Sequence, residues 1–257
     1  MSALRQDLRT IGALMRRGLN EILRVPGGAI PGVLAPAIFL IGLSGVFGAA
    51  GDLKGYQGDF TAYILPFGML QGATFTGAAT GVNLARDIEQ GWFDRLLLAP
   101  QRRSLLLLGL VSSASLRATL PATFLLLVGF ALGVGWPGIG ALAIAYVLIM
   151  GFAGVIACYA SLVALRFRTQ QAAPLMQIGG FIAILFTTAY APLTLQSTWL
   201  ADIARLNPVN KILEGVRQGF VPGTVTWPTT WQALVALAAM GLVLGGLAVR
   251  SMRRTGR

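Results

Sequence analysis

The segment RDIEQGWFDRLLLAPQRRS, residues 86–104, is the most charged stretch of a chain that is otherwise close to continuously apolar. Of the 257 residues, 55% are hydrophobic and only 11% are charged, whereas a soluble domain carries roughly 25% charged residues. The segment lies between two long apolar runs. This pattern predicts a loop that leaves a membrane and returns to it, and hence an all-α integral membrane protein.

Six apolar runs reach or approach the roughly 20 residues that a helix needs to cross the hydrocarbon core of a bilayer. They cover residues 29–50, 60–82, 105–134, 139–165, 174–195 and 231–249. We therefore expect six transmembrane helices in a single domain that covers residues 1–257. Before the first run, residues 1–28 carry apolar side chains at helical spacing with arginines on the other face, which predicts an amphipathic helix on the membrane surface.

The basic residues are distributed by loop, although the net charge of +11 alone would also suit a nucleic-acid partner. Fifteen of the 20 lysines and arginines lie before the first run, between the second and third, between the fourth and fifth, or after the sixth, and four lie in the alternate loops. Cytoplasmic loops carry such an excess. Both termini and residues 83–104 are therefore predicted to be cytoplasmic, with membrane lipids rather than nucleic acid as the partner of the positive charge.

The remaining basic residue, Arg117, lies within the third run. An arginine near the bilayer centre is costly, so it should reach the interface, pair, or face water. We favour a span that begins near Arg117 and leaves the preceding residues partly interfacial. The alternative is an arginine that faces an internal polar cavity.

The segment between the fifth and sixth runs, residues 196–230, has helical apolar spacing, and Trp199, Trp227 and the adjoining Trp231 are typical of a membrane interface. We expect short extracytoplasmic helices at the outer surface, broken at Asn207 and Pro208. The alternative is that they dip into the bilayer.

The sequence lacks the residues that several kinds of catalysis and coupled transport require. There is no histidine, none of the nine carboxylates lies inside an apolar run, and there is no GxxxxGK[ST] phosphate loop. No catalytic residues and no metal site are therefore expected, and a proton-coupled carrier is disfavoured. If the chain transports uphill, the energy should come from another subunit, so the chain itself is not predicted to be an enzyme.

The cytoplasmic loop carries a compact group of apolar side chains. Trp92, Phe93, Leu96 and Leu97 follow helical spacings, Gly91 allows a break between two helical pieces, and Pro100 ends the second. Such a helix suits insertion into a groove of a partner protein. The alternative is a short helix that rests on lipid headgroups.

Two motifs support a family resemblance. RDIEQGWFDRLLLAPQRRSLLLLG, residues 86–109, resembles the loop that follows the second span in type-two ATP-binding-cassette (ABC) transporter permeases, especially the daunorubicin-resistance-type drug-efflux branch. LNPVNKILEGVRQGF, residues 206–220, resembles the second landmark of that family, an Asn-Pro followed by an amphipathic helix. Trp92 stands where many members have Thr.

The resemblance implies a permease subunit of a bacterial plasma (inner) membrane exporter that pairs with a second copy of itself. Two copies of a separate ABC ATPase would bind ATP and Mg, and this chain would bind no cofactor. The loop would be the coupling helix seated on that ATPase. Its expected coupling residues are Arg86, Asp87, Glu89, Gly91, Trp92, Phe93, Asp94, Leu96, Leu97 and Pro100, and the expected outer gate is Asn207, Pro208 and Glu214.

Two groups of uncharged aromatic, amide and hydroxyl side chains form the expected substrate path: Gln71, Thr74 and Phe75 in the second run, and Phe186, Thr187, Thr188 and Tyr190 in the fifth. They suit a hydrophobic or amphipathic compound, such as a drug or natural product. Hydroxyls in spans also commonly bond a neighbouring backbone. The alternatives for function are export of a lipid-linked glycan or glycolipid, and a non-transporting membrane scaffold or immunity component.

Overall fold

The computed structural model describes residues 12–13, 15–16, 26–48, 59–93, 103–221 and 225–254. Within these ranges the chain is helical, apart from turns and one isolated bridge between Gln218 and Val221. The helices are α2 (Pro26–Phe47), α3 (Phe60–Glu89), α5 (Arg103–Arg117), α6 (Thr119–Ala131), α7 (Ile139–Phe167), η2 (Gln170–Ala172), α8 (Ala173–Leu185), η3 (Leu193–Leu195), α9 (Thr198–Leu206), α10 (Pro208–Arg217) and α11 (Trp227–Arg254). The all-α prediction is confirmed for this part of the chain.

Two sequence predictions fall mainly outside the described residues. The amphipathic helix of residues 1–28 is described only at positions 12, 13, 15 and 16, which are helical, and from residue 26, where α2 already begins. The second half of the cytoplasmic loop, with Asp94, Leu96, Leu97 and Pro100, is also outside them.

Three helical segments are long and apolar enough to cross a membrane, judged by length and composition. They are Ser104–Ala131, which joins α5 and α6, Ile139–Phe167 (α7) and Trp227–Arg254 (α11). A shorter apolar helix, Gly32–Phe47, forms most of α2. These four correspond to the first, third, fourth and sixth predicted runs.

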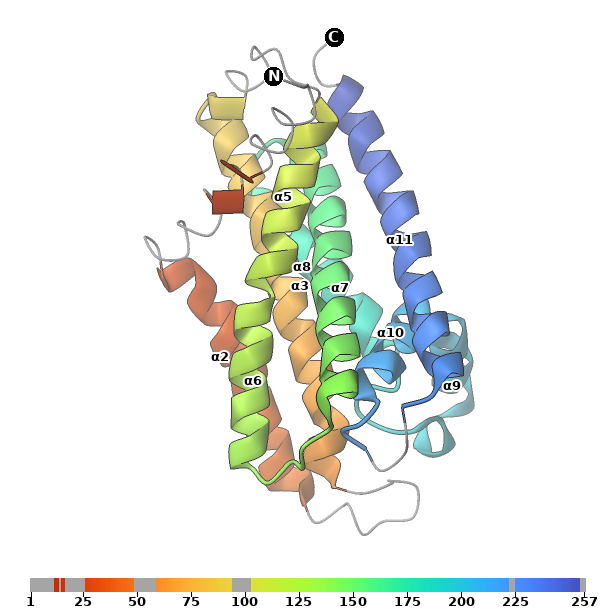
Figure 1. Cartoon of the computed structure of the whole chain (residues 1–257). Helices are drawn as coiled ribbons and strands as arrows, with labels where there is room; N and C mark the ends of the chain where they lie inside the picture. The colour runs from red at the N-terminus through yellow and green to blue at the C-terminus, as the bar shows by residue number, and fades with distance from the viewer. Residues whose placement is uncertain are drawn as a thin grey trace.

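Helix α3 is the centre of the bundle (Figure 1), with α2 and α6 on one side, α5 and α7 along it, and α8 on another. It is 30 residues long and buried over most of its length. The four glycines and four threonines of α3 fit this burial, because small side chains allow close approach of neighbours on all sides. The helix continues past the predicted end at residue 82 and stops at Glu89.

The fifth predicted run, residues 174–195, is not one helix, which corrects the sequence expectation. Helix α8 has 13 residues and ends at Leu185, so it is about 20 Å long and shorter than a bilayer core. Asn207 explains the end of the helix: its Nδ2 donates to the carbonyl oxygens of Ala183 and Phe186 at 2.7 and 2.8 Å. The side-chain amide thus replaces the next helical turn as the partner of these carbonyls.

The predicted break between two short helices is confirmed at Asn207. Its Oδ1 accepts a hydrogen bond from the backbone N–H of Val209 at 2.9 Å and caps α10, whose first residue is Pro208. Helix α10 is not a surface helix, because Val209, Asn210, Ile212, Leu213, Gly215 and Val216 are buried. It packs against α11 and α7 at the end of the bundle opposite to the last residues of α3 and α11 (Figure 1).

Arg117 is the last residue of α5, next to the break before α6, and is only 6% exposed. One of its terminal nitrogens, Nη2, donates to Thr80 Oγ1 of α3 at 2.5 Å. The side chain is thus enclosed between α5 and α3 instead of lying exposed at a surface, and it does not line the cavity described below.

Candidate functional site

The first element of the site is the end of α3, where the predicted coupling loop begins. The carboxylate of Glu89 accepts three hydrogen bonds from the segment that joins α7 to α8. Thr169 Oγ1 donates at 2.7 Å, the Gln170 backbone N–H at 3.0 Å and Gln170 Nε2 at 2.6 Å. Arg86 Nε donates to Gln170 Oε1 at 3.4 Å. Two loops that are 80 residues apart in the sequence are thus joined at one end of the bundle.

These donors stabilise the charged form of the carboxylate. They hold the pKa of Glu89 below its ordinary value of 4.5, with the Gln170 side chain contributing most, then Thr169 and the Gln170 backbone N–H. The α7 helix ends here because Arg168 has a left-handed backbone with φ of 57°. This turn presents Thr169 and Gln170 to Glu89.

The aromatic pair of the loop is divided between the interior and the surface. Gly91, with a φ of 71°, lies just beyond the end of α3 at Glu89, and Trp92 follows with 52% of its surface exposed. Phe93 is only 2% exposed and packs in a cluster with Ile88, Leu106 and Leu107. Because the Phe93 ring is enclosed by its own chain, Trp92 is the ring of this pair that a partner can reach.

A cavity of about 240 Å³ lies between α3 and α8. It is lined by Phe67, Gln71, Thr74, Phe75, Pro174, Gln177, Ile178, Phe181 and Ile184. No charged side chain lines it. Thr74 donates to the Leu70 carbonyl of its own helix at 3.0 Å, so its hydroxyl is already bonded. Gln71 is 3% exposed and its Oε1 has no hydrogen-bond partner.

The structure therefore brings the first predicted group, Gln71, Thr74 and Phe75, into one cavity but not the second group. Phe186, Thr187, Thr188 and Tyr190 lie in the turn beyond α8. Thr187 Oγ1 donates to the Ile184 carbonyl at 2.6 Å, as expected for a hydroxyl that satisfies a backbone. Tyr190 borders the cavity indirectly, since its ring centroid is 4.8 Å from that of Phe67.

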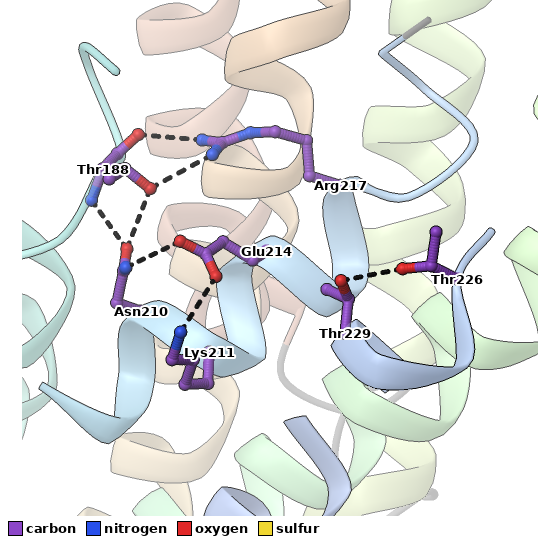
Figure 2. Close-up of polar contacts among 7 residues, drawn as sticks. All are labelled: Thr188, Asn210, Lys211, Glu214, Arg217, Thr226 and Thr229. Carbon is purple, nitrogen blue, oxygen red and sulfur yellow. Dashed lines mark hydrogen bonds and ion pairs between the residues drawn. The ribbon is translucent and has the colours of Figure 1, made fainter. Parts of the chain in front are cut away.

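Of the predicted gate residues, Glu214 belongs to a polar cluster beyond the cavity (Figure 2), whereas Asn207 and Pro208 form the start of α10. Asn210 Nδ2 donates to Glu214 Oε1 at 2.9 Å, and Lys211 lies 3.6 Å from the other Glu214 oxygen. Asn210 Oδ1 accepts hydrogen bonds from the backbone N–H and the hydroxyl of Thr188 at 2.9 and 2.8 Å. Arg217 also contacts Thr188, with Nη2 donating to its carbonyl oxygen at 2.9 Å.

A family model described as ABC-2 type transporter matches residues 9–221 of the chain. The chain belongs to this family. As an ABC-2 type transporter chain with several long apolar helices, it is a multi-pass membrane protein and the membrane subunit of an ABC transporter.

Two kinds of relative are similar to this ABC-2 chain. The putative transport permease ycf38 of Cyanophora paradoxa is 25% identical over 214 residues, which are 82% of this chain and 73% of the relative, and ycf38 of Porphyra purpurea is 26% identical over 229 residues, 87% and 77%. The probable multidrug ABC transporter permease YbhR of Escherichia coli (strain K12) is 27% identical over 173 residues, which are 63% of this chain and 45% of YbhR. The match thus spans less than half the length of YbhR.

Sequence reasoning missed six of the nine residues that line the cavity, and the centre of the polar cluster of the ABC-2 chain. On α8 it missed Gln177, the one amide in an otherwise apolar helix, which was a usable signal. It also missed Tyr63, Asn210 and Arg217. An arginine within an apolar-spaced helix beside an Asn-Pro break was a signal for Arg217, but its partners come from α3 and the turn after α8, which no local pattern connects.

Proposed function

We propose that the chain is the permease subunit of an ABC exporter that moves an uncharged hydrophobic or amphipathic compound out of the cell. The single observation that carries this proposal is the cavity between α3 and α8, which offers aromatic and aliphatic walls and two amides without a charge. The family supports the transport role, and the word multidrug in the name of YbhR agrees with such a substrate.

The cavity favours a drug or natural product over a glycan. A sugar presents hydroxyls on every side and needs many side-chain hydrogen bonds, whereas six of the nine lining residues are apolar. Gln71 Oε1 is a buried acceptor without a partner, and such an atom carries a desolvation penalty that a ligand donor would relieve. We therefore expect substrates with an apolar ring system and at least one N–H or O–H group.

The proposal includes six membrane spans in a single domain of residues 1–257, with α3 and α8 as the second and fifth, the latter completed by the inserted α10. It places both termini in the cytoplasm of a bacterial inner membrane, with residues 1–28 and 83–104 on that side and residues 196–230 outside. It also includes a second copy of the chain and two copies of a separate ABC ATPase that bind ATP and Mg.

Transport of dyes with different charges tests the substrate class. In cells that express the chain with its ABC ATPase, we expect ATP-dependent export of the neutral dye Nile red and much weaker export of anionic carboxyfluorescein. Phe75→Ala should reduce Nile red export because it removes an aromatic wall. Gln71→Leu should weaken export of dyes that carry a hydrogen-bond donor and leave Nile red export unchanged. Gln232→Leu, on α11 outside the cavity, is the matched control for this substitution.

Equal export of neutral and anionic dyes, or insensitivity to both cavity substitutions at normal protein levels, would contradict the substrate class. Loss of ATP-dependent export for every dye in a properly assembled complex would contradict the exporter itself.

The coupling role of the loop is tested at Trp92. If its exposed ring enters a groove of the ATPase, Trp92→Ala should lower affinity for that subunit by roughly thirtyfold, the equivalent of about 2 kcal/mol. Trp136→Ala is the control, because this ring is 65% exposed in the connection between α6 and α7 at the other end. If the ATPase co-purifies equally well with Trp92→Ala and with the parent, the coupling role of this ring is contradicted, and the ring would instead contact the lipid surface.

A further inference from the structure

The cavity between α3 and α8 ends at one side with Phe67 and Ile184. Tyr63 lies one helical turn beyond Phe67 on α3, and Thr188 lies four residues beyond Ile184 in the turn after α8. Tyr63 Oη donates to the Thr188 carbonyl at 2.8 Å. The first polar contact beyond the cavity thus joins the two elements that form its walls.

Arg217 of α10 closes the same place from a third element. Its Nη2 and Nη1 donate to the carbonyl oxygen and hydroxyl of Thr188 at 2.9 and 3.2 Å, and Nε donates to the Tyr63 carbonyl at 3.2 Å. The guanidinium carbon lies 3.8 Å from the centroid of the Tyr63 ring. One side chain therefore ties α10 to α3 and to the turn after α8. Figure 2 shows the fork on Thr188.

Asn210 contacts Thr188 from the other side: its Oδ1 accepts hydrogen bonds from the backbone N–H and the hydroxyl of Thr188. Asn210 is only 1% exposed. Thr188 and Tyr63 are also buried, at 4% and 6%. Each hydrogen-bonding group of Thr188 is thus occupied, and solvent does not compete for these contacts. Thr188 lies in a turn rather than a helix, so it can move away without unwinding a helical ladder.

We propose that Tyr63, Thr188, Asn210 and Arg217 form an outer latch that closes the α3–α8 cavity toward the outside and opens during export. This inference rests on the proposed export function and on the outward position of residues 196–230. It assigns the closing contact to Arg217 and Thr188, with Asn207, Pro208 and Glu214 as the residues that position them. The bonds are individually modest and reversible, as a contact that opens in every cycle requires.

Accessibility of the cavity tests the latch without ATPase or substrate. Cys158 is the sole cysteine, so Cys158→Ala combined with Thr74→Cys places one thiol in the cavity. The probe is a membrane-impermeant maleimide added outside intact cells. Arg217→Gln should raise the labelling rate about tenfold or more, because it removes several charge-assisted bonds, and Tyr63→Phe should raise it about two- to fivefold, because it removes one.

Two controls separate opening of the latch from general loosening. Arg205→Gln, an exposed arginine on α9 whose side chain pairs with Asp202, should leave the labelling rate unchanged. With Thr74 restored and the buried native Cys158 retained, Arg217→Gln should leave Cys158 unlabelled. Labelling of Cys158 as well would overturn the latch in favour of a purely structural role.

Unchanged labelling of Thr74→Cys in a monodisperse Arg217→Gln protein would also overturn the inference. If Arg217→Gln does not fold, Tyr63→Phe decides alone, since its ring remains under the guanidinium and only the hydroxyl is lost. Failure of the labelling assay would reject the latch but not the export proposal. If the labelling rate changes as expected but the complex shows no ATP-dependent dye export, the export proposal is rejected and the closing contact is retained.

Discussion

Arg117 illustrates how a single buried charge is accommodated in the middle of an apolar helical segment. It is 6% exposed and bonds Thr80 Oγ1, while Thr80 in turn donates to the Thr76 carbonyl at 3.2 Å. The arginine therefore joins a polar path on α3, formed by Thr80 and the Thr76 carbonyl. The long planar guanidinium places Nη2 against this single hydroxyl in a geometry that the ammonium of lysine does not reproduce.

The first prediction concerns Arg117→Lys. We expect the substitution to lower the free energy of unfolding by on the order of 1–3 kcal/mol. The lysine ammonium does not occupy the position of the guanidinium Nη2, so the bond to Thr80 is lost while a positive charge stays buried. Thermal unfolding of the detergent-solubilised protein measures it. Arg166→Lys is the control, since Arg166 is exposed near the end of α7. Equal stability of both variants would indicate an arginine that snorkels.

The second prediction concerns the pH dependence of the Glu89 contact. Its pKa is lowered in the folded chain, so its contribution is present above the ordinary value of 4.5 and is lost as the pH falls through the lowered value. Hydrogen exchange of the Gln170 backbone N–H should be slower in the parent than in Glu89→Gln at neutral pH, because the carboxylate accepts this N–H. After correction for intrinsic exchange, the difference should disappear on acidification.

Asp202→Asn serves as the control for that measurement, because this exposed carboxylate at the other end of the bundle pairs only with the surface residue Arg205 among the described contacts. It should leave exchange at Gln170 unchanged at every pH. A Gln170 N–H that exchanges at the same rate in Glu89→Gln and parent at neutral pH would mean that the carboxylate does not hold the second loop.

At the scale of elements, α3 and α7 approach each other through glycines. A Cβ added at Gly77 would lie 2.7 Å from the Ala153 carbonyl oxygen, and one added at Gly81 would lie 2.5 Å from Ala160 Cβ. Backbone atoms cannot yield as a flexible side chain can. The Gly77/Gly81 pair therefore sets the distance between the two central helices.

The third prediction is that Gly81→Ala destabilises the chain by about 1–3 kcal/mol, because the new methyl group overlaps Ala160. Gly245→Ala on α11 is a matched control, since its added Cβ would meet Cys158 Sγ at an ordinary 3.8 Å. The measurement is the apparent midpoint of thermal unfolding of Gly81→Ala and of Gly245→Ala in the same detergent. A Gly81→Ala protein as stable as Gly245→Ala would show that the helices can separate without penalty.

The elements show what the sequence could predict and what it could not. Apolar length identified α2, α7 and α11, and the Asn207–Pro208 break identified α9 and α10, because these signals are local. The end of α8 at Leu185 was not predictable from apolar length, since Asn207 supplies the bonds from 21 and 24 residues away. Likewise, three of the four cavity residues on α3 were predicted, whereas the other wall depends on how α8 packs.

At the scale of the whole molecule, charge separates the two ends of the bundle. Glu89, Arg166, Arg168 and Arg254 lie where α3, α7 and α11 end, and the α9–α10 hairpin lies at the opposite end (Figure 1). The surplus of arginines at the first end is what the positive-inside rule expects of a cytoplasmic face. With that face cytoplasmic, as proposed, the cavity and the outer latch would lie in order along the proposed direction of export.

The fourth prediction is that the two ends face opposite sides of the membrane. In the Cys158→Ser background, Asp202→Cys on α9 should react with an impermeant maleimide in intact cells, because this position is exposed at the outer end. Gln90→Cys, exposed after α3, should react only after the membrane is permeabilised. Labelling of Gln90→Cys in intact cells would reverse the orientation. It would place the Glu89 loop on the wrong side for an ATPase, and the proposed coupling would fail with it.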